Sequence, residues 1–189
     1  MKKTILVIYG PPGVGKLTIG QQLSTKTGFK FFNGHRLADV VHSIFDFGTK
    51  EFVNTTNFLW LFLFEKLVKS KTQGIIVSFV YGVQTLEGRH DEQFCKKIIT
   101  IAKRNRAKIH FIKLTCSDNE LYKRVQNKSR TQFGKLTSAT LLKKIRKSYK
   151  VDEIIPFVNN KVIDTTSLTP KQAADRIITQ LNMNPLKSS

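Results

Sequence analysis

Short apolar runs alternate with longer amphipathic stretches along most of the chain. The runs are rich in β-branched residues, which predicts strands buried on both faces of a sheet. The helical patterns between them predict βαβ units and therefore a parallel sheet in an α/β fold. The expected strands are 4–9, 29–32, 74–81, 109–115 and 161–164, and the expected helices are 16–27, 37–45, 51–70, 91–105, 119–126, 138–150 and one from 170 onward.

Several residues fit the expected helix ends. Gly28 follows the first helix, where a left-handed C′ residue is favoured. Ser117 or Asp118 is suited to cap the helix through 119–126. Thr169 followed by Pro170 predicts the start of the last helix.

An aromatic stripe runs through the expected helix 51–70. The stripe alternates with leucines, which is typical of a helix that is covered on several sides. We therefore predict a buried core helix rather than a ligand-stacking Trp60. The stripe consists of Phe58, Trp60, Phe62 and Phe64.

The length of 189 residues favours one domain, expected over 1–182 and followed by a tail at 183–189. Cys95 and Cys116 have no spacing typical of a disulfide framework or a zinc site, which favours a reducing cytosol. The apolar run 5–9 is too short for a signal peptide, and the run 58–64 is too short to span a bilayer. The sequence therefore predicts a cytoplasmic protein.

The net charge of +19 is unevenly distributed. The segment 103–150 holds 15 Lys or Arg residues against only Asp118 and Glu120, which leaves about +6 for the rest of the chain. Such a segment is suited to follow a nucleic-acid backbone or to surround a site for phosphorylated small molecules. A lysine-rich solvated surface explains it equally well.

A phosphate-binding motif follows the first expected strand and opens the first expected helix. It reads Gly10-Pro11-Pro12-Gly13-Val14-Gly15-Lys16, the Gly-x-x-x-x-Gly-Lys of a P-loop in its required context. The glycines permit the positive φ that turns successive N–H groups toward an anion. The helix N-terminus adds its dipole, and the lysine is suited to reach the β- and γ-phosphates of ATP.

One position of this motif is unusual. The residue after the lysine is normally Ser or Thr, whose hydroxyl ligates Mg²⁺, but here it is Leu17 and the hydroxyl comes on Thr18. Adjacent helical residues point about 100° apart, so Thr18 cannot take over the same ligand position. We expect ATP to bind over 10–18 with Mg²⁺ weakly held by the protein and turnover slow.

Carboxylates are also scarce where a kinase needs them. The third expected strand ends without an aspartate, and Asp91 comes too late in the sequence to take its place. After the second strand, His35, Asp39 and His42 share one face of a helix that starts early. This trio could supply a catalytic base with an orienting acid, part of a metal site, or an ordinary helix surface.

These features resemble the nucleoside-monophosphate-kinase-like branch of P-loop proteins, such as adenylate and shikimate kinases. A closer resemblance is to uncharacterised bacterial proteins labelled as AAA-family ATPases or shikimate-kinase-like. It rests on "GPPGVGKLT" at 10–18, "FNGH" at 32–35 and "FGKLT" at 133–137, and those proteins share the leucine after the lysine. The resemblance covers nearly the whole chain and implies a three-layer fold with a five-stranded parallel sheet in the order 2-3-1-4-5.

The resemblance also implies roles for residues after the fourth strand. A lid is expected at about 127–136, and Arg124 and Arg130 lie where lid arginines would neutralise charge on the transferred phosphoryl group. They could also be ordinary members of a basic stretch. Asp164, Thr165 and Thr166 fall where such kinases have a loop that lines the adenine.

Two functions from different classes remain open from the sequence. The first is an ATP-dependent small-molecule kinase, in which Lys16 and the lid arginines stabilise the transition state and His35 or Asp39 accepts the substrate proton. The second is a nucleotide- or polynucleotide-binding module with weak or no catalysis, which would use the segment 103–150. No membrane partner is expected, and no residue is assigned as a metal ligand.

Overall fold

The computed structural model describes residues 2–83, 90–127, 130 and 136–186. The expected elements are present with small shifts at their ends. In chain order they are β1 (Thr4–Tyr9), α1 (Lys16–Thr27), β2 (Lys30–Asn33), α2 (Gly34–His42), α3 (Lys50–Lys69), β3 (Gly74–Phe79), α4 (His90–Arg104), β4 (Lys108–Thr115), α5 (Asp118–Val125), α6 (Ala139–Ser148), β5 (Asn160–Asp164) and α7 (Pro170–Gln180).

The five strands form one parallel sheet in the order β2-β3-β1-β4-β5, which confirms the expected topology. In the centre of the sheet Val7 of β1 pairs with Val77 of β3 on one side and Phe111 of β4 on the other. Because all strands run the same way, their carboxyl ends meet at one edge, called the carboxyl edge below. Ligands of open α/β sheets bind outside this edge, where the chain changes direction between strands.

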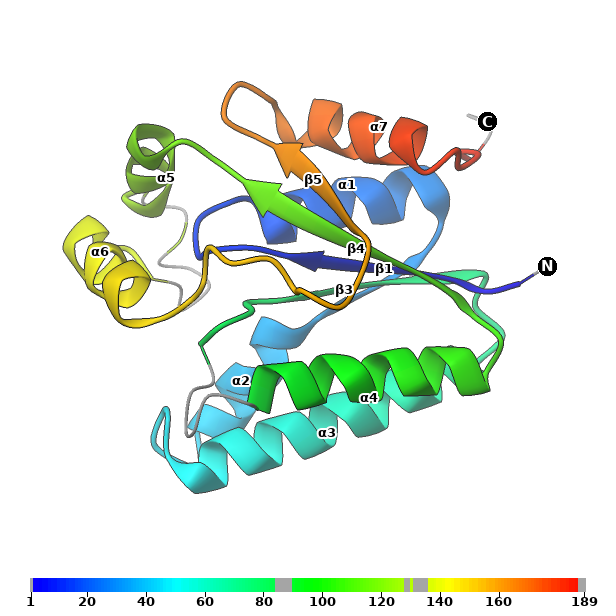
Figure 1. The fold of residues 1–189 in the computed structure, drawn as a ribbon, viewed down its shortest axis with the longest axis horizontal. Helices are drawn as coiled ribbons and strands as arrows, with labels where there is room; N and C mark the ends of the chain where they lie inside the picture. The colour runs from blue at the N-terminus through cyan, green and yellow to red at the C-terminus, as the bar shows by residue number, and fades with distance from the viewer. Residues whose placement is uncertain (1, 84–89, 128–129, 131–135, 187–189) are drawn as a thin grey trace.

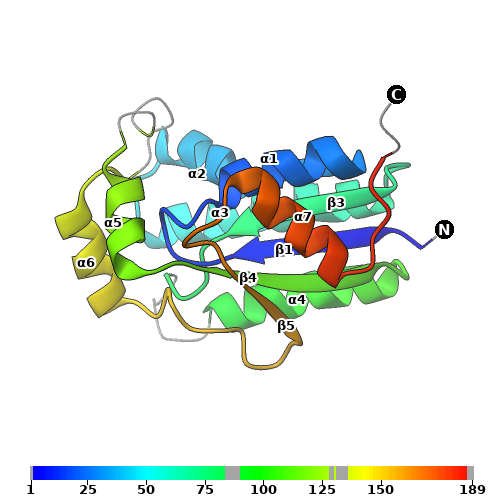
Figure 2. The ribbon, with the colours of Figure 1, turned by 90° about the horizontal axis from the view of Figure 1, so that it is seen from above.

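Helices cover both faces of the sheet. Figure 1 shows α1 and α7 on one face and α3 and α4 on the other. Side chains alternate along β1, so Leu6 and Ile8 pack toward α1 and α7 while Ile5 and Val7 pack toward α3 and α4. Figure 2 shows α5 and α6 side by side beyond the carboxyl edge.

The aromatic stripe of α3 is only half buried, so the prediction of a helix covered on several sides was wrong for one of its faces. Trp60 is 3% exposed and Phe64 is fully buried, whereas Phe58 is 67% and Phe62 49% exposed. Residues two apart point to nearly opposite sides of a helix, so the stripe divides into two i, i+4 pairs. The inner pair contacts the sheet, and the outer pair stacks on the surface with ring centroids 6.4 Å apart.

Two helix starts follow from capping side chains. α2 begins at Gly34 rather than at 37 because Asn33 Oδ1 accepts a hydrogen bond from His35 N. Thr169 and Gln172 form a reciprocal capping box at the start of α7, with Pro170 in the first turn, as predicted.

Helix α2 packs on α3 and on one of the main cores. Its buried Val41 packs with Phe52 and Val53 of α3 in a small separate cluster, and Leu37 packs against the core cluster that contains Trp60. Val40 and Ile44 on the outer side are 60% and 72% exposed. One side of α2 is therefore held by apolar contacts and the other faces solvent.

The basic residues of 103–150 do not form one surface. Lys103 and Arg104 end α4 and Lys108 begins β4, so they lie at the amino edge of the sheet. The basic residues of α5 and α6 lie beyond the carboxyl edge, at the other end of the molecule (Figure 1). Among the described helices none is long and apolar enough to cross a membrane.

The expected tail begins in contact with the body of the protein. Met183 packs against the core beneath α1 and α7, and Leu186 N donates to Lys26 O at 2.7 Å. Residues 187–189 lie outside the described part of the chain.

Candidate functional site

The loop between β1 and α1 lies at the carboxyl edge and has the backbone of an anion-binding turn. Gly10, Gly13 and Gly15 have φ values of 147°, 92° and 101°, a region that side chains with a Cβ rarely adopt. At Gly13 a Cβ would also lie 2.6 Å from Val125 Cγ2 of α5. The glycines therefore set both the turn and its close approach to α5.

The lysine and the two residues after it lie in the first turn of α1. Lys16 Nζ donates to Gly10 O and Pro11 O, each at 2.8 Å, which places the ammonium group across the loop. Leu17 is half-buried and offers no oxygen, and Thr18 is exposed with Oγ1 donating to Gly15 O at 3.1 Å. Pro12 and Val14 complete the expected ATP-binding segment.

A buried threonine connects this loop to the ends of β4 and β5. Thr165 is 1% exposed, and its Oγ1 lies 3.3 Å from Val14 O and 2.9 Å from Thr115 O. The neighbouring Asp164 Oδ1 accepts hydrogen bonds from the Thr166 amide and hydroxyl, which lowers the pKa of that carboxyl. The expected adenine loop is therefore a rigid turn fastened to the phosphate-binding loop.

Arg124 holds the same turn from α5. Its Nε donates to Glu120 Oε1 at 2.8 Å, Nη1 to Thr165 Oγ1 at 3.0 Å and Nη2 to Thr165 O at 2.7 Å. The planar guanidinium thereby fixes α5 against the turn that contacts Val14. No sequence pattern signals this link, because its partners are 41 residues apart.

Arg130 lies in the expected lid, most of which is outside the described residues. Its Nε donates to Leu136 O at 2.9 Å, and its backbone N donates to Asn127 O at 3.0 Å. Burial lowers the pKa of the Arg130 guanidinium, which still stays charged at neutral pH because arginine is so strongly basic. The arginine thus joins Asn127, which follows α5, to Leu136, which precedes α6.

Of the three residues expected to share one face of α2, two lie close together. His35 Nδ1 lies 3.5 Å from Asp39 Oδ1, one turn apart, and both side chains are exposed. His42 is the last residue of the helix, and its ring instead packs edge-on against Phe47 and Phe52. The structure therefore forms a His–Asp pair at the carboxyl edge and leaves His42 out of it.

The described residues offer little to a metal ion. They contain no cluster of three or more His, Cys, Asp or Glu side chains that could hold one. The Asp91 carboxylate, in the first turn of α4, accepts a 2.6 Å hydrogen bond from the backbone N of Gly82, which follows β3. Together with the leucine at position 17, the donor set does not fit a protein-held Mg²⁺ ion.

A second polar network holds the segment after α6 on the strand that leads into the phosphate-binding loop. Tyr9 Oη donates to Asn160 Oδ1 and accepts from Ile155 N. Lys113 is 1% exposed, lies over the Tyr9 ring and donates to Val151 O at 3.2 Å. Burial lowers the pKa of Lys113 from 10.5 to about 8 and raises that of Tyr9 to about 12.

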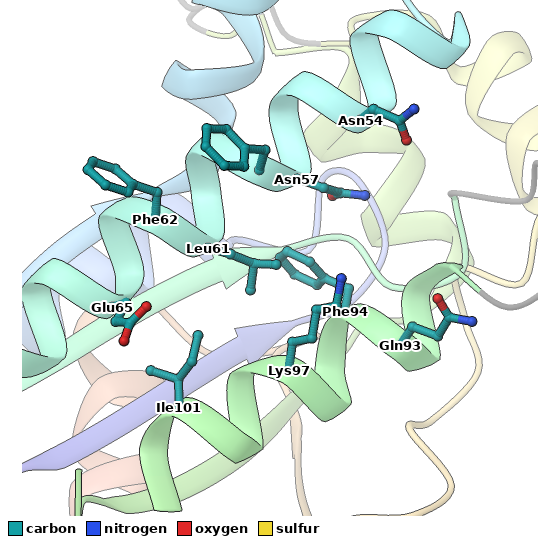
Figure 3. A pocket seen from close by; sticks show the side chains of 10 residues that line it. Asn54, Asn57, Leu61, Phe62, Glu65, Gln93, Phe94, Lys97 and Ile101 are labelled. Atoms are coloured by element: carbon teal, nitrogen blue, oxygen red, sulfur yellow. The ribbon is translucent and has the colours of Figure 1, made fainter. Parts of the chain in front are cut away.

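A groove of about 500 Å³ runs between α3 and α4 on the outer side of these helices (Figure 3). Asparagine and glutamine amides lie at one end and aliphatic and aromatic groups along its floor. Its described lining comes entirely from these two helices: Asn54, Asn57, Phe58, Leu61, Phe62, Glu65, Gln93, Phe94, Lys97 and Ile101. It is thus distinct from the phosphate-binding loop.

No protein-family model matches the chain, and no curated protein matches its sequence. Several solved structures share its fold over almost its whole length. A sugar kinase from Janibacter sp. HTCC2649 is 16% identical, covers 99% of both chains and has a TM-score of 0.63.

Two further neighbours are also kinases. A gluconokinase from Sinorhizobium meliloti 1021 is 17% identical over 95% of this chain and 91% of its own, with a TM-score of 0.60. A shikimate kinase from Acinetobacter baumannii, solved in complex with shikimate, is 15% identical over 95% and 93%, with a TM-score of 0.55. At this level of identity the likeness establishes a common fold, that of P-loop kinases of small molecules.

Proposed function

We propose that this protein transfers the γ-phosphoryl group of ATP to a hydroxyl group of a small molecule. One observation carries the proposal. A glycine-rich loop with positive φ and a crossing lysine occupies the carboxyl edge of a sheet with the topology of small-molecule kinases. The His35–Asp39 pair at the same edge supplies a base and its orienting acid.

Each residue then has a defined task. Backbone N–H groups of Gly13 and Gly15 hold phosphate oxygens, and Lys16 swings from the loop carbonyls to bind them. ATP supplies the phosphoryl group. His35 accepts the proton of the substrate hydroxyl while Asp39 fixes the tautomer and orientation of its ring.

The two arginines have different tasks in this proposal. Arg130 stabilises the negative charge that develops on the transferred phosphoryl group, because its guanidinium is planar and permanently charged. Arg124, whose guanidinium is held by Glu120 and Thr165, is a positioning residue that keeps the loop in place. Position 17 offers no oxygen, so we assign Mg²⁺ no protein ligand there and no step.

A screen for ADP release tests the proposal. The protein is incubated with ATP and, one at a time, with sugars, sugar acids and shikimate. We expect one acceptor class to raise ADP release well above the acceptor-free rate, and Lys16→Ala to abolish the increase. Lys30→Ala removes the same charge at the opposite edge of the sheet and serves as the matched control.

The other hypothesis from the sequence, polynucleotide binding through 103–150, has weaker support. Its basic residues lie at opposite ends of the molecule rather than along one surface. Tight binding of single-stranded RNA with a steep salt dependence, and no acceptor in the screen, would replace the kinase proposal with this one.

A further inference from the structure

Two polar side-chain atoms on α3 are buried without a hydrogen-bond partner among the described residues. They are Thr56 Oγ1 and Trp60 Nε1, whose residues are 8% and 3% exposed. Side chains four residues apart lie on the same helix face, so both residues belong to one patch of that face. Buried polar atoms are almost always paired, and an unpaired one costs stability, so this patch calls for an explanation.

The patch lies at the carboxyl edge of the sheet. A Cβ on Gly34 would lie 2.6 Å from Trp60 Nε1 and 3.1 Å from Ser78 O, so only glycine allows this approach. Gly34 is the first residue of α2, directly before His35, and Ser78 is near the end of β3. The indole N–H is therefore next to the turn that carries the proposed base.

One side of the indole is held firmly. The rings of Phe32, Phe64 and Phe94 pack around it, with centroids at 5.2, 5.2 and 4.8 Å. Phe79 adds an edge contact at 6.3 Å. These contacts fix the direction of the N–H, since the ring cannot turn without losing them.

The Nε1 side of the indole is approached by Gly34 in the first turn of α2. This helix packs through Val41 on Phe52 and Val53 of α3, and through Leu37 on the core cluster that contains Trp60. A shift of Gly34 away from the indole would uncover Nε1. The groove in Figure 3 is a separate feature, because neither Thr56 nor Trp60 lines it and Phe94 stands between.

We propose that Trp60 Nε1 and Thr56 Oγ1 bind an oxygen atom of the phosphoryl acceptor once the first turn of α2 moves off the indole. The indole N–H donates, and the hydroxyl donates or accepts according to the acceptor group. The pair thereby selects acceptors whose bound pose places an oxygen atom beside Trp60 Nε1 and Thr56 Oγ1. The assignment rests on the proposed function, because it gives this patch to the acceptor of that reaction.

The first test needs no acceptor. Trp60 is the single tryptophan of the chain, so its indole N–H gives one isolated signal in a ¹H–¹⁵N NMR spectrum. We expect a shift typical of an unbonded indole and exchange with D₂O about 10-fold or more faster than the core amide of Val77. A hydrogen-bonded shift, as a bridging water would give, or exchange as slow as that of Val77, overturns the proposal even if phosphoryl transfer is confirmed.

The second test uses Thr56→Val, which keeps the shape of the side chain and removes its hydroxyl, and Trp60→Phe, which removes the N–H together with part of the ring. With the acceptor found by the ADP screen, we expect KM for the acceptor to rise about 3- to 10-fold in each variant with KM for ATP unchanged, and the melting temperature to fall only in Trp60→Phe. Phe94→Leu is the control for packing alone, and we expect it to lower the melting temperature without changing KM. If Trp60→Phe behaves like Phe94→Leu, the indole is only structural.

Discussion

The phosphate-binding loop and the first turn of α2 lie at the same edge of the sheet but are built differently. The loop is fastened on several sides, through Thr165 to β4 and β5 and through Arg124 to α5. Helix α2 instead packs through apolar side chains, with Leu37 on the core cluster that contains Trp60 and Val41 on Phe52 and Val53 of α3. In the reaction that we propose, the hydrogen-bonded loop on the donor side is the preformed cradle for ATP, and the first turn of α2 on the acceptor side is the part that moves when the acceptor binds.

The largest effect is expected on the donor side. Lys16→Ala removes the charge that crosses the loop, and we predict that ATP affinity falls at least about 30-fold, since a charge-assisted contact is lost. Titration with a fluorescent ATP analogue measures it, with Lys30→Ala as control. Equal affinity in both variants would mean that the loop does not hold the phosphates.

On the acceptor side, His35→Gln should lower kcat by about 100-fold and leave ATP affinity unchanged, because the side chain acts only on the proton of the acceptor. The matched control is His42→Gln on the same helix, whose ring packs against phenylalanines and should leave kcat near wild type. Steady-state kinetics decide between them. Equal kcat values would remove His35 from the mechanism.

The two arginines separate positioning from chemistry. Arg130→Ala should lower kcat by about 10-fold or more with little change in ATP affinity. Arg124→Ala removes the hydrogen bonds from the guanidinium to Thr165 and Glu120, so it should lower the free energy of unfolding by about 1–3 kcal/mol and weaken ATP binding. Chemical denaturation and nucleotide titration on both variants test this, and the reverse pattern would exchange the two roles.

A smaller effect is expected from Leu17→Ser, which adds one oxygen to the first turn of α1. We predict that it tightens Mg²⁺–ATP binding by about 3- to 10-fold and leaves metal-free ATP binding unchanged. Leu17→Ala trims the same side chain without adding oxygen and is the control. Calorimetry with and without magnesium measures the difference. Strong magnesium dependence already in the wild type would show that another residue holds the ion.

The smallest effect concerns Lys113 beneath the donor side. Its pKa is lowered to about 8 in the folded protein, so between pH 8 and 10.5 the unfolded chain binds more protons than the folded one. The contribution of this group to the free energy of unfolding therefore rises with pH in that range, by at most about 1.4 kcal/mol per pH unit. In Lys113→Met the free energy of unfolding should no longer rise between pH 8 and 9.5. In Lys161→Met, which changes an exposed residue of β5, the rise should remain. An unchanged pH slope in Lys113→Met would contradict this.

The sequence predicts the fold and the backbone of the glycine-rich loop well for a physical reason. The strands are continuous apolar runs, and the loop depends on glycines and a lysine that are adjacent in sequence, so local patterns define both. The burial of the aromatic stripe on α3 was predicted wrongly, because the pattern does not reveal which helix face meets the sheet.

The remaining features depend on contacts between distant segments. The bond from Arg124 to Thr165, the approach of Trp60 to Gly34 and the burial of Lys113 all join residues far apart in the chain. No spacing rule signals such contacts. In contrast, the His35–Asp39 pair is one helix turn long, so its i, i+4 spacing made it visible.

The most direct measurement of the central claim is ³¹P NMR of a reaction that contains the protein, ATP and the acceptor from the ADP screen. We predict that one equivalent of a new phosphoester signal appears for each ADP formed, and that neither appears with Lys16→Ala. ADP together with free phosphate and no phosphoester would show hydrolysis without transfer, and would contradict the assignment of this protein as a small-molecule kinase.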